Sequence, residues 1–258
     1  MTLAQAITRF LEHTRLIDST VNTPGFNPQP SLLLLTEYFQ TDTKLSEVMP
    51  STLRDFLSRW YVERAAASMH NGLQQCESDA PPLARQATNV SNQRASDQVP
   101  EPHNLLTSLE VLFKWADRQT GQSQHAKLSP ILIELRRSLP PALELTDALS
   151  SAVRGRGGAF TFPEFLTSFE AGGSSQYDID VPGNVGAIDG YLRIIRVEGS
   201  SVEAEELISE QRVWPIIFPD KVSALLSPGY IIGLELVRDR QGWQIAGCGF
   251  AYPPGTEI

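Results

Sequence analysis

The first part of the chain carries apolar side chains at the spacing of amphipathic helices. In LLTSLEVLFKWADRQTG these residues share one helix face: Leu105, Leu109, Leu112, Phe113 and Ala116. The same spacing predicts helices in MTLAQAITRFLEHTRL, SLLLLTEYFQ, STLRDFLSRWYVERAAAS, LSPILIELRRSL and PPALELTDALSSAV. In the last two, prolines are expected at helix starts, where a fixed φ and a missing N–H are tolerated. The pattern predicts an all-α helical bundle.

Local signals mark some of the helix ends. Thr2 with Gln5 forms a capping box for the first helix, and Thr107 with Glu110 offers another if the later helix begins late rather than at Asn104. Gly121 suits the end of that helix. Residues 76–102 are polar, rich in proline and without an apolar period, so we expect a flexible insertion there.

The second part of the chain changes to short runs rich in β-branched and aromatic residues, separated by turn residues. These runs are AFTFPEF, GYLRIIRVE, SVEAEEL, RVWPIIF, GYIIGLELV and GWQIAGCGFAY. Short connections such as EGSS favour hairpins and antiparallel order, and therefore a small barrel or sandwich. A short helical turn is expected in FPDKVSALLSPG. The predicted fold class is α+β in two domains, a helical one at 1–153 and a β domain at 154–258.

Charge narrows the range of partners. The whole chain carries a formal net charge of -9. Residues 155–258 hold 7 basic and 14 acidic side chains, a net of -7, which leaves -2 for the rest. The net charge therefore argues against a nucleic-acid-binding protein whose whole surface is basic. Only the helical part is close enough to neutral to hold a basic patch.

Cysteine use and hydropathy concern the compartment. Cys76 and Cys248 belong to no CxxC or Cys/His cluster, which indicates free thiols in a reducing compartment. No apolar run approaches the roughly 20 residues of a membrane span. We expect a cytoplasmic protein with no membrane partner.

Motifs for catalysis are missing from the sequence. There is no phosphate-binding GxxxxGK[ST] loop, no GxGxxG opening a helix, no HExxH and no GxSxG. The four histidines show no metal-ligand spacing: His13, His70, His103 and His125. We therefore predict no enzyme activity, no cofactor and no metal site.

Weaker features leave alternatives open. Asp178 and Asp180 could hold a divalent cation and serve an unrecognised hydrolase or nuclease, or they could belong to a solvated loop. RGRGG at 154–158 could wrap a phosphate, and a linker explains it equally well.

The β domain adds two features of the same kind. Four glutamates could serve solubility or meet a basic partner: Glu203, Glu205, Glu206 and Glu210. Of these, Glu203 and Glu205 should share the solvent face of a strand. Six aromatic residues could stack on bases but are predicted to be mainly core: Tyr191, Trp214, Tyr230, Trp243, Phe250 and Tyr252.

Two segments carry a family resemblance. LSEVMPSTLRDFLSRWYVE and LLTSLEVLFKWADRQTG resemble the N-terminal core-binding, or SAM-like, domain of tyrosine recombinases and phage integrases, at Pro50 to Trp60 and Leu106 to Trp115. The likeness covers about residues 1–150. No HxxR segment occurs in the chain, so the resemblance transfers no catalytic residue. It implies contacts to duplex DNA through Arg54, Arg59, Arg64, Lys114, Arg118, Arg136 and Arg137.

The sequence thus predicts a non-catalytic binding or adaptor protein. Double-stranded DNA is the first expected ligand, through the helical domain. The alternative is a protein-protein interaction or assembly module that uses the acidic β domain.

Overall fold

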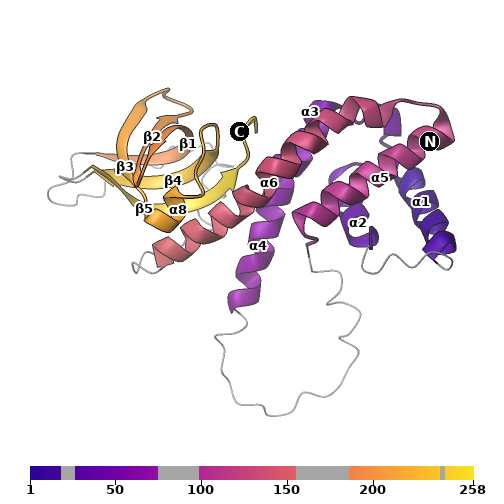
Figure 1. Cartoon of the computed structure of the whole chain (residues 1–258), viewed down its shortest axis with the longest axis horizontal. Helices are drawn as coiled ribbons and strands as arrows, with labels where there is room; N and C mark the ends of the chain where they lie inside the picture. Colours follow the sequence, from indigo (N-terminus) through magenta and orange to yellow (C-terminus); the bar gives the residue numbers. More distant parts are fainter. Residues whose placement is uncertain (19–26, 75–98, 155–185, 239–241) are drawn as a thin grey trace, which may run out of the picture. The chain divides into compact units, whose positions relative to one another are not determined.

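The computed structural model describes residues 1–18, 27–74, 99–154, 186–238 and 242–258. The chain divides into two compact units, Met1–Pro140 and Pro141–Ile258, which we call the helical unit and the β unit (Figure 1). The first contains helices, and the second contains a five-stranded sheet together with the last turns of one helix and a short helix, so helices precede strands as the sequence predicts. Within the described part of the chain, no helix combines the length and apolar character needed to cross a bilayer.

The helical unit consists of these elements: α1 (Leu3–Asp18), α2 (Gln29–Tyr38), η1 (Leu45–Glu47), α3 (Pro50–Asp55), η2 (Phe56–Trp60), α4 (Tyr61–Gln74), α5 (Pro102–Thr120) and the first turns of α6 (Gln124–Arg154). The segment η2 is a π-helical turn, so α3, η2 and α4 follow one another without a loop. All of the long helices contribute buried apolar residues to the core, and on one face of α5 the predicted apolar residues are fully buried.

Capping residues define the helix ends. The predicted box at the start of α1 is confirmed, with Thr2 N–H donating to Gln5 Oε1 at 3.1 Å and Gln5 N–H donating to Thr2 Oγ1 at 3.2 Å. Helix α5 ends at Gly121, whose φ of 70° is left-handed. The second predicted box is wrong, because α5 begins at Pro102 and Glu110 lies mid-helix.

Helix α6 corrects a further prediction. The two helices expected in LSPILIELRRSL and PPALELTDALSSAV are one helix of 31 residues that runs through Pro140 and Pro141. Each proline removes one N–H donor from the helix interior, which is unfavourable. The buried row nevertheless continues across them, through Leu139 and Ala142, and its burial offsets this loss. The unit boundary falls between these prolines, earlier than the 153/154 division expected from the sequence, because the last turns of α6 belong to the core of the β unit.

The start of α6 is held by Asp117 from the end of α5. Its carboxylate accepts the Gln124 N–H at 2.8 Å and the His125 N–H at 2.9 Å, which satisfies two N–H groups that have no partner within the helix. We expect Asp117→Ala to lower the free energy of unfolding by about 1 kcal/mol, as loss of a helix cap does. Thermal unfolding would measure this, and Asp117→Asn, which keeps one acceptor oxygen, should lose less.

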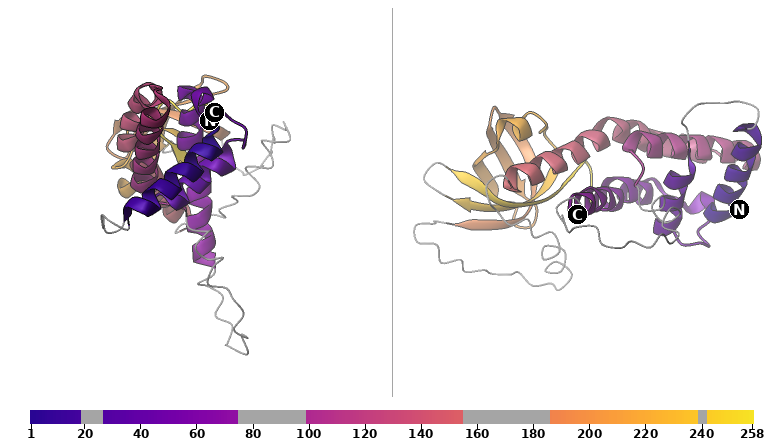
Figure 2. Two further views of the ribbon diagram at one scale, coloured as in Figure 1. Left: turned by 90° about the vertical axis from the view of Figure 1, so that its right-hand side faces the viewer. Right: turned by 90° about the horizontal axis from the view of Figure 1, so that it is seen from below.

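The β unit contains β1 (Ala187–Glu198), β2 (Ser201–Glu206), β3 (Arg212–Ile217), β4 (Ile231–Arg238) and β5 (Trp243–Tyr252). The short helix α8 (Asp220–Ser223) lies between β3 and β4, where a helical turn was predicted. The strand order is β1-β2-β3-β5-β4, and the sheet closes on itself because β4 also pairs with β1. Figure 2 shows the curvature of the sheet. The sequence predicted antiparallel pairing throughout, but β3 and β5 pair in parallel, at Ile216↔Trp243 and Ile217↔Gln244.

The core of the β unit combines the inner face of the sheet with the last turns of α6. Ala142, Leu145 and Leu149 pack in one cluster with inward residues of the strands. Thr146, on the same helix, accepts the backbone N–H of Ala251 in β5 at 3.0 Å and donates to Ala142 O at 2.9 Å. One hydroxyl thereby joins the helix to a strand in a fully buried setting.

Several predictions concern residues outside the described ranges. These are most of the insertion at 76–102, the strand AFTFPEF, the pair Asp178 and Asp180, the RGRGG segment after Arg154, and Cys76.

Candidate binding surface

Most of the basic residues predicted to contact DNA are engaged by carboxylates. Five of the seven form ion pairs within the helical unit: Arg54 with Glu134, Arg59 with Glu63, Arg64 with Glu37, and both Lys114 and Arg136 with Glu110. Arg118 and Arg137 form no ion pair with any residue that the structure describes. The seven residues therefore do not form an uncompensated basic patch, and their role in DNA binding stays a prediction.

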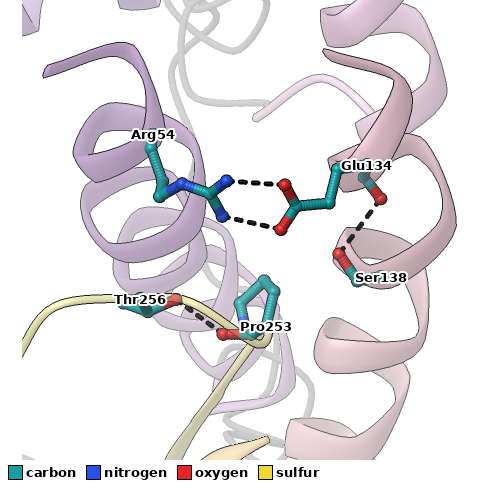
Figure 3. A network of polar contacts seen from close by, with 5 residues as sticks. All are labelled: Arg54, Glu134, Ser138, Pro253 and Thr256. Atoms are coloured by element: carbon teal, nitrogen blue, oxygen red, sulfur yellow. Dashed lines mark hydrogen bonds and ion pairs between the residues drawn. The ribbon is translucent and has the colours of Figure 1, made fainter. Parts of the chain in front are cut away.

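The strongest of these pairs joins Arg54 to Glu134. Both guanidinium Nη atoms donate to the carboxylate, at 2.8 and 2.6 Å, in a bidentate arrangement (Figure 3). The hydrogen bonds from Arg54 lower the pKa of Glu134 below its usual value. This geometry ties α3 to α6 within the helical unit and indicates a structural role.

Glu110 forms a second such centre. Lys114 Nζ lies 2.5 Å from Glu110 Oε1 and Arg136 Nη2 lies 2.7 Å from Glu110 Oε2. Their hydrogen bonds, that of Lys114 first, lower the pKa of Glu110 despite partial desolvation. Arg64 combines its ion pair to Glu37 with an aromatic contact, because its guanidinium also lies 5.9 Å from the centre of the Trp60 ring.

The β unit presents a different surface, formed by the outer faces of β1, β2 and β3. Two register shifts converge there on Glu203. Between Ile194↔Ala204 and Arg196↔Glu203, Ile195 is an extra residue in β1. Between Ala204↔Val213 and Val202↔Ile216, β3 places Trp214 and Pro215 opposite the single residue Glu203. Both are β-bulges, which re-aim side chains locally.

The first bulge decides which way two arginines point. Residues three apart in a regular strand face opposite sides of the sheet. Because Ile195 is extra, Arg193 and Arg196 are both exposed, on either side of the buried Ile194. The second bulge places Trp214 beside Glu203 and Arg196.

The side chains on this surface form ion pairs: one network that joins Arg212, Glu203, Arg196 and Glu198, and a separate pair of Arg193 with Glu205. Glu203 accepts Arg212 Nη1 at 3.1 Å and lies 3.4 Å from Arg196 Nε. Arg196 also lies 3.0 Å from Glu198, and Arg193 lies 3.6 Å from Glu205. The Arg196 Cζ atom is 5.3 Å from the centre of the Trp214 ring. We call this surface the Trp214 face: Arg193, Arg196, Glu198, Glu203, Glu205, Arg212 and Trp214.

Trp214 differs from the other aromatic residues of the β unit in its exposure to solvent. Five of the six named from the sequence are buried, as predicted: Tyr191, Tyr230, Trp243, Phe250 and Tyr252. Trp214 keeps 40% of its surface exposed. Ile208, in the turn between β2 and β3, is 78% exposed. An exposed tryptophan beside stacked and ion-paired arginines is a composition found at the centres of protein interfaces.

The glutamates predicted as one acidic cluster have separate roles. Glu203 and Glu205 do share the outer face, as expected, and both pair with arginines. Glu206 faces the other way and is buried, where it accepts the N–H groups of Ile208 at 3.1 Å and Ser209 at 2.5 Å. Burial opposes its ionisation, yet these bonds and that of the Ser209 hydroxyl lower the pKa of Glu206. Glu206 therefore shapes the turn and offers nothing to a partner.

No group of three or more His, Cys, Asp or Glu side chains converges on a possible metal position among the described residues. His13, His103 and His125 all lie on helices of the helical unit. The His13 ring lies at an angle of 39° to the Trp115 ring, with ring centroids 6.1 Å apart.

The chain was also compared with known proteins. No family model, no curated protein and no solved structure matches it.

Proposed function

We propose that this chain is a non-catalytic binding protein whose β unit contacts a protein partner. The observation that carries the proposal is the exposed Trp214, which Arg196 covers and which shares one face of the sheet with two further ion-paired arginines, Arg193 and Arg212. Trp and Arg supply much of the binding energy at protein interfaces, because they bury large areas and donate several hydrogen bonds. The pairing of five predicted DNA contacts with carboxylates also favours this function over DNA binding.

Photo-crosslinking in the native cells tests the proposal. A photoreactive residue at position 208, on the exposed turn beside the Trp214 face, should yield a discrete crosslinked protein. The matched control is the same residue at position 133, since Ile133 is also exposed at 56% but lies on α6 in the helical unit. Equal crosslinking patterns from both positions, or none from position 208, would contradict the proposal.

Duplex DNA is the second candidate, through a helical unit that we propose to be related to the integrase core-binding domain. It is supported by Arg118 and Arg137, which have no carboxylate partner among the described residues, and by the exposed pairs of Arg59 and Arg64, which a phosphate could replace at small cost. A mobility shift at low salt should then weaken as salt rises, by about 0.9 in log affinity per decade for each phosphate neutralised. Unchanged binding in Arg118→Ala/Arg137→Ala would remove these two residues as contacts.

A further inference from the structure

The charges of the Trp214 face are layered. The arginine side chains are 48%, 55% and 64% exposed at Arg193, Arg196 and Arg212. The carboxylates that they meet on β2 are more covered, with 27% exposure at Glu205 and 17% at Glu203. Three arginines and three glutamates cancel in number. Glu198, at 52% exposure, is as accessible as the arginines, so the guanidinium groups are the more exposed partners only over β2. Over β2 a partner therefore meets cationic groups first, although the net charge of the chain is -9.

These guanidinium groups retain donors for a ligand. Each carries five N–H donors, and Arg212 gives one of them, on Nη1, to Glu203. The glutamates below hold the arginines in place and so reduce the entropy that is lost when a second acceptor binds. Carboxylate oxygens match the spacing of the guanidinium fork, and Trp214 offers an apolar surface next to it.

Two classes of macromolecule carry acceptors of this kind. A nucleic acid strand brings a phosphate charge at every nucleotide, and some of these would lie against Glu198 and Glu203. A protein segment can place one or two carboxylates on the arginines and an aromatic or aliphatic side chain on Trp214. The alternation of charges on this face therefore favours the protein segment.

The overall negative charge of the chain does not oppose such binding at close range. Interactions between exposed charges are largely screened beyond about 8 Å at physiological ionic strength. The arginines in direct contact then determine the preference. Added salt should still weaken the complex, because the new ion pairs would be partly exposed.

We infer that the Trp214 face binds an acidic protein segment whose carboxylates pair with Arg196 and Arg212 and whose apolar side chain covers Trp214. The inference rests on the proposed function and specifies its partner.

Peptide display provides the test. A random peptide library is selected against the full-length chain, and the affinities of the recovered peptides are measured by fluorescence anisotropy. We expect enrichment of Asp and Glu next to aromatic or aliphatic residues. Trp214→Ala and Arg212→Ala should each weaken binding by about tenfold or more, as loss of a central interface residue does. A single-stranded oligothymidylate serves as the nucleic acid probe.

The β unit offers a matched control in Arg238→Ala. Arg238 is an exposed arginine on β4 whose Cζ lies 5.6 Å from the centre of the Trp243 ring, the same contact as that of Arg196 with Trp214, but Trp243 is only 7% exposed. Arg238→Ala should leave peptide affinity unchanged. Circular dichroism verifies folding of each variant, and Arg212→Ala keeps the test valid if Trp214→Ala does not fold.

The outcomes separate the two proposals. Peptides that bind Trp214→Ala and Arg212→Ala as tightly as the wild type would overturn this inference and leave the proposed function standing. Selection of basic peptides, or oligothymidylate binding that depends on Trp214, would also overturn it. Failure to recover any peptide, together with no crosslink at position 208, would remove both.

Discussion

Phe113→Ala is expected to lower the free energy of unfolding by about 3–5 kcal/mol, because it deletes a fully buried aromatic ring and leaves a cavity in the helical core. Urea unfolding followed by far-ultraviolet circular dichroism measures the loss. The matched control is Val111→Ala on the same helix, where 37% of the side chain is exposed and the change should be within about 0.5 kcal/mol. Similar shifts in both variants would mean that this face of α5 is not the core.

Thr146→Val should destabilise the β unit by about 1–3 kcal/mol. Valine has nearly the shape of threonine but removes the acceptor of the Ala251 N–H, and Ala251 is fully buried, so the donor would be left without a partner. Thr146→Ser keeps the hydroxyl and serves as the control, losing only a methyl group. The unfolding temperature of the three proteins measures the difference. If Val is tolerated better than Ser, the hydrogen bond does not stabilise this junction.

The helices and strands could largely be predicted from apolar spacing. The faces of α5 and β2 follow the 3.6- and two-residue periods, and the turn residues delimit the hairpins. The continuity of α6 could also have been predicted. Its buried positions Leu135, Leu139, Ala142, Leu145 and Leu149 keep one helical face across the two prolines, and this period outweighs the local rule that proline begins a helix.

The Trp214 face could not be predicted in the same way. Arg193 and Arg196 lie three residues apart, and a regular strand would place them on opposite sides of the sheet. Only the extra residue Ile195 gives them a common side, and no local pattern announces it. Trp214 was one of six aromatic residues with similar surroundings in sequence, and its exposure depends on the shift of β3 against Glu203.

For the arginines of the helical unit, the sequence predicted the exposed positions but not the ion-pair partners. Their positions on helix surfaces follow from the sequence, but their partners do not. Arg54 and Glu134 are 80 positions apart, and Arg136 meets Glu110 from the following helix. Charge counts therefore could not distinguish a DNA-binding surface from one neutralised by ion pairs.

The shared helix α6 has a practical consequence for dividing the protein. A fragment that starts at Arg154, where the sequence changes composition, would lack the apolar side chains that α6 adds to the core of the β unit, Leu145 and Leu149 among them, and the Ala251 amide would lose its acceptor. Such a fragment should expose the apolar face of the sheet that α6 covers, and should therefore self-associate. A fragment that begins before Pro141 keeps the last turns of α6 packed on the sheet. It is the smallest fragment of the β unit that we expect to remain monodisperse when it is produced alone.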